Sequence, residues 1–286
     1  MAENLTSATA CYRDLRGKNA LVTGAGKPAG IGFAIARKLA QNGANVALAD
    51  ISREQTDNPL VSDERQAPAQ RADELAAAFG VKTMALPVDV TDGASISRMA
   101  DTLKDRFQRV DILCNNAGTV FGVPSGLHTY DDDAWRKTID VNLNGVFRVS
   151  KAIVPLMLAN GGSIINSASQ AGKKAPLFNG AYAVAKAGVI MLTRVMALEL
   201  GSSAIRVNAV CPGIIDTDFT AWRFELEAAM LNTTVEAGRR NRCREIPLGR
   251  IGTPAEVADL VVFLASNASR YMTGQALNVT GGMTMD

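Results

Sequence analysis

The chain has 286 residues, 47% of them hydrophobic and 20% charged, a mix typical of globular proteins and not of disordered ones. Its 30 basic and 28 acidic residues leave a formal net charge of +2, too small to indicate binding to nucleic acid or to a membrane surface. Four scattered cysteines, Cys11, Cys114, Cys211 and Cys243, form no C-x-x-C pair and accompany a single histidine, His128. The sequence therefore predicts no metal site, no disulfide framework and reduced thiols.

Neither end of the sequence carries a membrane or export signal. Residues 1–16 are polar, lack the apolar run of a signal peptide and are predicted to form an N-terminal arm. The uninterrupted apolar run at residues 260–265 is too short to span a bilayer. We therefore expect a cytoplasmic protein without a membrane segment, and a single domain over residues 17–286.

Short apolar runs alternate with helical patterns along that domain. The predicted strands are, in chain order, residues 19–23, 45–50, 83–88, 111–114, 163–166, 205–210 and 276–279. The predicted helices between them are residues 31–41, 70–79, 96–109, 132–158, 182–200 and 254–266. Apolar strands that alternate with helices indicate a parallel sheet covered on both sides. The expected fold is α/β, a single Rossmann-type doubly wound parallel sheet with helices on both faces.

Two segments interrupt this alternation. Residues 52–68 are polar, contain two prolines and are predicted to be a surface insertion. The segment at about residues 216–247 is longer than an ordinary connection and leaves the carboxyl end of a strand, where such sheets bind ligands. We interpret it as a lid over a substrate site; the alternative is a flexible surface excursion.

A glycine-rich turn joins the first predicted strand to the first predicted helix. Gly24, Gly30 and Gly32 allow the backbone to turn tightly and to approach a pyrophosphate. The helix that begins at Ile31 offers free N–H groups and the positive end of its dipole to that anion. The turn therefore predicts a dinucleotide site.

An acidic residue, Asp50, ends the second predicted strand and is followed by Ile51. A carboxylate there accepts hydrogen bonds from the adenosine ribose and repels a 2′-phosphate, so it favours NAD over NADP. Lys27 and Arg53 are close enough in the sequence to weaken that preference. The alternative interpretation of Asp50 is a solvated carboxylate at a strand end.

A tyrosine and a lysine lie one helical turn apart in the helix predicted at residues 182–200. Tyr182 and Lys186 share one helix face, so we expect the ammonium to lower the phenol pKa from about 10 toward neutrality. Such a phenol is a usable general acid or base for an alcohol proton. An isolated pair with this spacing is usually a solvated face, but Ser169 follows the strand predicted upstream and can hydrogen-bond the same substrate oxygen.

These landmarks, in this order, resemble those of the short-chain dehydrogenase/reductase family over residues 17–282. Besides the glycine turn, Asp50, Ser169 and the tyrosine–lysine pair, the resemblance rests on Asp89-Val90, Asn115-Asn116-Ala117-Gly118, Asn142 in V-N-L-N-G, Pro212-Gly213 and Pro247-Leu248-Gly249-Arg250.

The resemblance implies four catalytic residues. Tyr182 is then the general acid/base, Ser169 orients the substrate oxygen, and Lys186 holds the nicotinamide ribose and lowers the tyrosine pKa. Asn142 is implied to keep a water in the proton relay. Family members are usually dimers or tetramers, so we expect a homo-oligomer acting on a small-molecule alcohol or ketone.

The resemblance also implies the cofactor contacts. Asp89 and Val90 correspond to adenine contacts, Asn115 and Gly118 to the wall behind the adenosine ribose and phosphates. Ile215 and Thr217 correspond to contacts with the nicotinamide carboxamide. The full predicted set is Gly24, Gly30, Ile31, Gly32, Asp50, Ile51, Asp89, Val90, Asn116, Ala117, Gly118, Tyr182, Lys186, Pro212, Gly213, Ile215 and Thr217.

Two positions depart from the family pattern. The usual turn is TG-x-x-x-GIG, whereas here A-G-K-P-A separates Gly24 from Gly30, and Pro28 lacks an N–H donor. The usual acid before the final Gly-Gly is replaced by Thr280.

Several residues keep two interpretations each. His128 is predicted to lie on the surface. The arginines at 239–244 form a solvated face or a clamp for an anionic substrate. Phe219, Trp222, Phe178 and Val120 line an apolar pocket or pack in the core and lid, and Gln170 contacts substrate or caps a strand end.

The function expected from the sequence is transfer of a hydride between NAD(H) and a secondary alcohol or ketone. One alternative is an NADPH-dependent 3-oxoacyl-carrier-protein reductase, because basic residues near the lid suit a carrier's phosphate arm, although Asp50 disfavours it. The other is a non-catalytic NAD-binding sensor, which does not need the four residues Asn142, Ser169, Tyr182 and Lys186 together.

Overall fold

The computed structural model describes residues 12–51 and 67–286. In that part of the chain the strands form one sheet in the order β3-β2-β1-β4-β5-β6-β7, and all neighbours are parallel. The strands are β1 (Asn19–Thr23), β2 (Asn45–Asp50), β3 (Thr83–Pro87), β4 (Ile112–Asn115), β5 (Gly162–Ser167), β6 (Ile205–Pro212) and β7 (Ala276–Val279). This confirms the predicted doubly wound sheet; β1, β2 and β7 have the predicted ends, and the other strands differ by one or two residues at an end.

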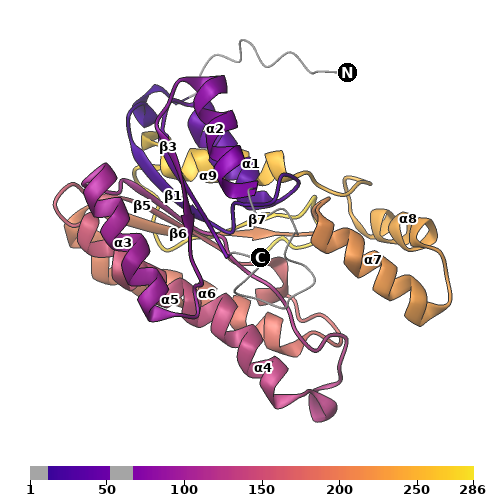
Figure 1. Cartoon of the computed structure of the whole chain (residues 1–286). Coiled ribbons are helices and arrows are strands. Elements are labelled where there is room, and N and C mark those ends of the chain that lie inside the picture. Colours follow the sequence, from indigo (N-terminus) through magenta and orange to yellow (C-terminus); the bar gives the residue numbers. More distant parts are fainter. Residues whose placement is uncertain (1–11, 52–66) are drawn as a thin grey trace.

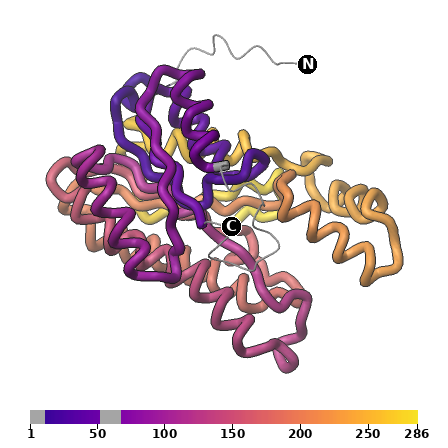
Figure 2. Tube along the Cα trace, in the orientation of Figure 1, coloured from indigo at the N-terminus to yellow at the C-terminus, as the bar shows by residue number. Residues whose placement is uncertain are grey.

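Helices cover both faces of the sheet (Figure 1). They are α1 (Ile31–Gln41), α2 (Ala67–Phe79), α3 (Gly93–Phe107), α4 (Asp132–Ile139), α5 (Gly145–Ile153), α6 (Gly180–Leu200), α7 (Asp218–Leu231), α8 (Val235–Glu245) and α9 (Pro254–Ala265). The helices α1, α2 and α9 pack on one face, and α3, α5 and α6 on the other. Although far apart in the sequence, α1 and α9 lie side by side (Figure 2), and Lys38 pairs with Asp259 at 2.6 Å.

Alternation along the strands explains the two cores. In β1, Ala20 and Val22 belong to the core under α1 and α9, whereas Leu21 belongs to the core under α3 and α5. Every residue of β1 is buried, as expected for a strand covered on both faces. In α1, the spacing of Ile35 and Leu39 places both on the side that packs against the sheet.

The prediction of one continuous helix at residues 132–158 is wrong in detail. It is divided into α4, a π-helical turn (Asp140–Asn144), α5 and a 3-10 turn (Val154–Leu156). The π turn places Asn142, whose Nδ2 donates to the carbonyls of Thr138 and Thr119 at 2.8 and 2.5 Å. Pro155 lies in the final 3-10 turn, where it has no N–H for an α-helical bond.

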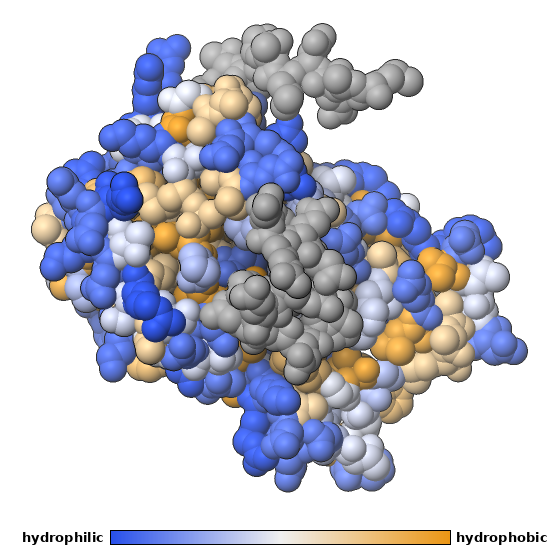
Figure 3. All heavy atoms as spheres, viewed as in Figure 1, coloured by the Kyte–Doolittle hydropathy of each residue, from blue (hydrophilic) through white to orange (hydrophobic). Residues whose placement is uncertain are grey.

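The predicted lid segment is mostly helical. After Thr217 caps α7 and Thr234 caps α8, the two helices project beyond the sheet edge (Figure 1). They are attached through a small cluster of Phe224, Ile246 and Ile251. Hydrophobic surface lies among hydrophilic surface over this projection (Figure 3).

The predicted arm lies mostly outside the described residues, as does nearly all of the predicted insertion. Residues 12–16, the described end of the predicted arm, pack against the rest of the domain. Leu15 is only 1% exposed, and the Tyr12 N–H donates to Asn42 Oδ1 at 3.0 Å. Within the described ranges, α6 with its following turn is long and apolar enough to cross a membrane. It nevertheless packs against the sheet as a core helix, with Val189 and Ala197 buried.

Candidate active site

The carboxyl ends of β1, β4, β5 and β6 meet at one edge of the sheet. The last residues of these strands are Thr23, Asn115, Ser167 and Pro212. The chain leaves β1 toward β2 on one side and returns through β4 on the other, which makes these ends the topological switch point where such sheets bind ligands. The predicted catalytic and cofactor residues follow β1, β4, β5 and β6, stand at or after the ends of β2 and β3, or lie in α1, in α6 and in the π-helical turn between α4 and α5.

The glycine turn after β1 leaves three N–H groups free at the start of α1. Within the described part of the chain, the N–H groups of Ile31, Gly32 and Phe33 donate to no protein acceptor. A Cβ on Gly32 would lie 2.1 Å from the carbonyl oxygen of Gly24, so only glycine fits there. This arrangement suits a pyrophosphate.

The inserted residues of that turn form a β-turn. The Gly30 N–H donates to the Lys27 carbonyl at 3.0 Å, which places Pro28 at the second position, where a fixed φ is favourable and no N–H is needed. The departure from the family pattern therefore leaves the N–H groups of α1 available.

The carboxylate of Asp50 is held against the inserted turn. Oδ2 accepts the Gly26 N–H at 2.6 Å, and Oδ1 accepts the Ile51 N–H at 2.8 Å. Burial raises the pKa of Asp50, whereas these two N–H groups and the charge of Lys27 act to lower it. The Asp50 carboxylate is thus held in place at the end of β2 and is not freely solvated.

Asn116 fastens the loops that follow β1, β4 and β5. Its Nδ2 donates to the carbonyls of Thr23 and Gly24 at 3.1 Å each, and its Oδ1 accepts the Ser167 hydroxyl at 3.2 Å. The Thr23 hydroxyl in turn accepts the N–H groups of Asn116 and Ala117. The sequence analysis missed Thr23, although a threonine before the first glycine is visible there.

The four predicted catalytic residues converge near Gly118. A Cβ on Gly118 would lie 2.8 Å from Asn142 Oδ1 and 3.5 Å from Lys186 Nζ. Asn142 Oδ1 is buried and has no hydrogen-bond partner among the residues that the structure describes. Lys186 Nζ donates to the Ser167 carbonyl at 2.8 Å and lies 5.5 Å from the ring centroid of Tyr182.

Ser169 completes this group from the loop after β5. Its hydroxyl accepts the Ala171 N–H at 3.1 Å and is close enough to Tyr182 to hydrogen-bond the phenol. The serine is 8% exposed. The structure therefore brings Ser169, Tyr182, Lys186 and Asn142 together.

The expected effect of Lys186 on the phenol requires correction. Burial raises the pKa of Tyr182 above its usual value, although the Ser169 hydroxyl and the charge of Arg223 act to lower it. Burial also lowers the pKa of Lys186 to about 8. The ammonium lies beside the ring and bonds the Ser167 carbonyl, so it does not offset the desolvation of the phenol in this structure.

The turn after β6 brings the predicted nicotinamide contacts to the same edge. Gly213 is so close to Thr280 that a Cβ would lie 2.9 Å from the Thr280 Cα and 3.4 Å from Gln170 Oε1. Within residues 12–51 and 67–286, no donor reaches the buried Gln170 Oε1. Ile215 is 4% exposed, and Thr217 Oγ1 accepts the Thr220 N–H at the start of α7.

The position of the usual family acid has a structural role here. The Thr280 hydroxyl donates to the Thr284 carbonyl at 3.2 Å and accepts the Thr284 N–H at 3.3 Å. It therefore folds the segment after β7 back behind Gly213.

The predicted adenine contacts lie after β3. The Asp89 carboxylate accepts the N–H and hydroxyl of Thr91 at 2.8 and 2.7 Å, so it stabilises its own turn. Val90 is 7% exposed and lies against Gly145 at the start of α5.

Two of the arginines at 239–244 are bound within the projection. Arg239 pairs with Asp216 at 3.0 Å, and Arg242 pairs with Glu227 and Glu245. The arginine that affects Tyr182 is instead Arg223 on α7, which the sequence analysis did not single out.

The residues with two interpretations are placed as follows. His128 is exposed in a 3-10 turn (Leu127–Thr129). Val120 is 5% exposed, whereas Phe178 is 54% exposed and has φ +58°. Phe219 and Trp222 pack on each other, with ring centroids 5.8 Å apart.

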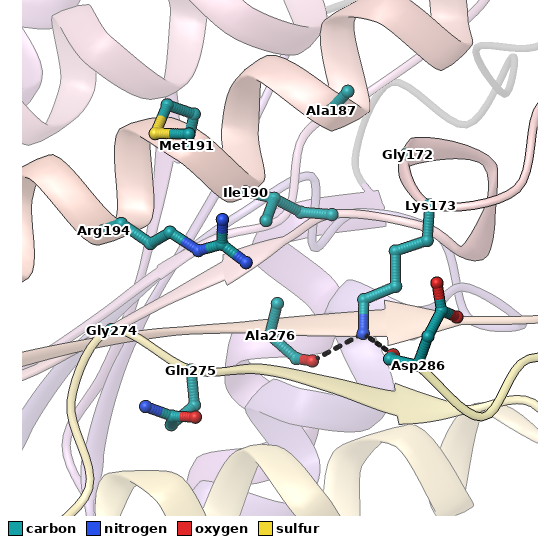
Figure 4. Close-up of a pocket in the computed structure, with 10 residues that line it drawn as sticks. All are labelled: Gly172, Lys173, Ala187, Ile190, Met191, Arg194, Gly274, Gln275, Ala276 and Asp286. Atoms are coloured by element: carbon teal, nitrogen blue, oxygen red, sulfur yellow. Dashed lines mark hydrogen bonds between the residues drawn. The ribbon is translucent and has the colours of Figure 1, made fainter.

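A cavity of about 470 Å³ lies behind the catalytic helix, between α6 and β7. Figure 4 shows Lys173 bridging the carbonyls of Ala276 and Asp286 at one side, with Arg194 of α6 pointing in from the other. This cavity does not include Tyr182 or Ser169. Across residues 12–51 and 67–286 no cluster of His, Cys, Asp and Glu is placed to hold a metal ion.

Comparison with known proteins agrees with this geometry. A family model described as enoyl-(acyl carrier protein) reductase matches residues 24–284. The 3-oxoacyl-[acyl-carrier-protein] reductase of Thermotoga maritima is 37% identical over 95% of this chain and 99% of its own. The trans-4-hydroxycyclohexanecarboxylate dehydrogenase of Sinomonas cyclohexanicum is 40% identical over 93% of each chain.

Solved structures are similar over the whole fold. An actinorhodin polyketide ketoreductase with NADPH has a TM-score of 0.84 and 33% identity, covering 93% of this chain and 97% of its own. An NAD⁺-bound xylitol dehydrogenase has a TM-score of 0.83 and 32% identity, covering 94% and 99%. The fold and site thus define a nicotinamide-dependent oxidoreductase. The chain belongs to the short-chain dehydrogenase/reductase family.

Proposed function

We propose that the chain is an NAD(H)-dependent oxidoreductase that interconverts a secondary alcohol and its ketone. The observation that carries this proposal is the convergence of Ser169, Tyr182, Lys186 and Asn142 around Gly118, at the sheet edge where α1 presents free N–H groups. A protein that only binds nucleotide does not need this set.

The glycine turn and α1 would hold the pyrophosphate, and Asp50, Gly118 and Ile215 the rest of the cofactor. The cofactor supplies the carbon that accepts or donates the hydride. The Ser169 hydroxyl holds the substrate oxygen, and Tyr182 takes or returns its proton. Lys186 would hold the nicotinamide ribose, and Asn142 Oδ1, which has no donor among the described residues, would accept from a water that relays the proton.

The preference for NAD rests on Asp50. Its carboxylate stands at the end of β2, where it would repel a 2′-phosphate. The positive charge of Lys27 acts on this carboxylate and would weaken the repulsion. The similar solved structures include complexes with NADPH and with NAD⁺. Replacing Asp50→Ser should shift the ratio of kcat/KM values toward NADP⁺; an unchanged ratio would mean that another residue sets the preference.

A second candidate is reduction of a 3-oxoacyl group on a carrier protein, favoured by the similarity to the Thermotoga maritima reductase. The arginines of the projection that suit an anionic carrier arm are partly neutralised by Asp216, Glu227 and Glu245. Turnover of hydroxyacyl thioesters with NADP⁺, and not of free secondary alcohols with NAD⁺, would establish this candidate.

The surroundings of the site complete the proposal. We take residues 216–247 as a lid over the substrate and the protein as cytoplasmic.

An apolar face on α5 and α6 is exposed, with Phe147 50%, Met191 55% and Leu198 87% exposed, and it would pair with a second copy. Light scattering should then give a dimer or tetramer, and Leu198→Lys should weaken it.

The direct test is the absorbance of reduced nicotinamide during incubation with NAD⁺ or NADP⁺ and a panel of secondary alcohols, cyclic diols and hydroxyacyl thioesters. Turnover of one alcohol class with NAD⁺ supports the proposal. Cofactor binding without turnover of any compound in either direction would favour the non-catalytic sensor.

A further inference from the structure

One face of α7 carries apolar side chains and one arginine. Because a helix has about 3.6 residues per turn, Phe219, Trp222, Arg223 and Leu226 lie on one stripe. Thr220, Phe224 and Ala228 lie on the buried face that anchors the helix. We name the first set the α7 stripe.

The α7 stripe is half-buried but packs into no described core. Phe219, Trp222 and Leu226 are absent from the buried clusters of the described residues and from the side chains packed on them. The rings of Phe219 and Trp222 contact each other. An apolar stripe on a helix that starts at this ligand-binding end of the sheet is suited to contact a ligand.

The guanidinium of Arg223 is fixed at one end and free at the other. Its Nε donates to Glu227 Oε1 at 2.9 Å, and its side chain is 42% exposed. Among the described residues its two terminal nitrogens have no acceptor. Glu227 is also shared with Arg242, at 3.3 Å. An arginine held through Nε keeps the fork of terminal N–H groups that binds a carboxylate in bidentate fashion.

The stripe begins beside the strand end where the predicted catalytic residues gather, because α7 starts at Asp218, directly after Thr217 and the turn that follows β6. The charge of Arg223 reaches Tyr182, where it acts to lower the pKa of the phenol. No such effect on Tyr182 comes from Arg239, Arg240 or Arg242 of α8. Arg223, in the second turn of α7, is therefore the arginine of this projection that we place beside a bound substrate.

We propose that the α7 stripe recognises the substrate and that Arg223 selects molecules with a carboxylate on an apolar skeleton. The inference rests on the proposed function, since it names the substrate class of that site. A phosphate is less suited, because a doubly charged group usually recruits several cations and the neighbouring Arg239 and Arg242 are already paired.

The test is a calorimetric titration of the protein with simple saturated acids, from acetate to cyclohexanecarboxylate, each beside its uncharged amide, with and without NAD⁺. The wild-type protein should bind at least one acid about 10- to 100-fold more tightly than its amide. Arg223→Gln should bring that ratio close to unity, and Arg223→Lys should give an intermediate ratio because it lacks the fork. Arg240→Gln, an exposed arginine of the same lid, is the matched control and should keep the wild-type ratio.

Two results would overturn the inference: no acid that binds more tightly than its amide, or a preference that survives in Arg223→Gln. Loss of NAD⁺ binding is a separate result that counts against the proposed function, since the acid-to-amide ratio is also read without cofactor.

Discussion

Tyr182, Lys186 and Asn142 lie on helices packed against the sheet, where Asn142 is fully buried and Lys186 is 3% exposed. Helix α8 of the proposed lid is instead held by ion pairs at the surface, such as that of Arg239 with Asp216 in the turn before α7, with side chains 48% and 52% exposed. Buried polar groups cost free energy when they lose a partner, whereas exposed ion pairs are worth little. We therefore expect the buried residues Asn142 and Lys186 to tolerate few changes, and the proposed lid to be the region where substrate preference can vary without loss of the fold.

The largest effect is expected from a substitution in the glycine turn between β1 and α1, which belongs to the part of the molecule that packs on the sheet. Gly32→Ala places a methyl group 2.1 Å from the Gly24 carbonyl, so the turn must open. We expect NAD⁺ affinity to fall by about 100-fold or more, because hydrogen bonds to a charged group contribute about 1.5–3 kcal/mol each. Gly201→Ala, which meets no atom within 4 Å, should bind NAD⁺ normally in the same titration.

The next effect concerns the π-helical turn. Asn142→Ala removes Oδ1, the oxygen proposed to accept a hydrogen bond from the water of the proton relay, so kcat should fall by about 100-fold. Asn144→Ala, in the same turn, loses a bond to Asp140 Oδ1 and should keep most of the activity. Equal losses in both variants would show that the turn matters only for folding.

A third prediction uses the buried charge of Lys186. Its pKa is about 8 in the folded chain against 10.5 ordinarily, so folding is disfavoured while the lysine is charged in both states. The contribution of Lys186 to the stability of the wild-type protein is therefore most favourable above pH 10.5, where the lysine is neutral in both states. That stability is lost as the pH falls through about 8, where the folded chain must take up the buried charge. Lys186→Met should therefore be inactive yet more stable at neutral pH, by up to about 3 kcal/mol.

The advantage of Lys186→Met should shrink as the pH rises from about 7 to about 10, measured by urea unfolding. Lys151→Met, at an exposed position of α5, is the control and should show no such trend. A pH-independent difference between Lys186→Met and the wild type would contradict a buried charged lysine.

The smallest effect is expected in the lid. Arg239→Gln breaks an exposed ion pair with Asp216, so the free energy of unfolding should change by less than about 1 kcal/mol. A loss above about 2 kcal/mol in urea unfolding would show that the lid is held more firmly than its surface pairs indicate.

Local signals were sufficient for the sheet, and together with the family resemblance they selected residues that the structure brings together near Gly118. Each strand is an apolar run of sequence, and the glycine turn and the Tyr182–Lys186 spacing are contiguous, so both are readable without tertiary contacts. The break in the helix predicted at residues 132–158 was not readable, because it depends on Asn142 bonding the distant Thr119 carbonyl.

The electrostatics of the site were also beyond the sequence. Spacing alone indicated that Lys186 lowers the pKa of Tyr182, but the burial of both groups outweighs their proximity. The arginines considered as an anion clamp, at 239–244, are contiguous and basic, whereas Arg223 becomes notable only when α7 is placed at the ligand-binding end of the sheet. Such relations arise from tertiary structure.

The most direct test of the central claim is the rate of NADH formation by Tyr182→Phe beside the wild-type protein, with NAD⁺ and an alcohol that the wild type oxidises. The account predicts a loss of about 100- to 10,000-fold in kcat with NAD⁺ affinity nearly unchanged, because only the proton acceptor is removed. Turnover by Tyr182→Phe at the wild-type rate would contradict the assignment of Tyr182 as the general acid/base.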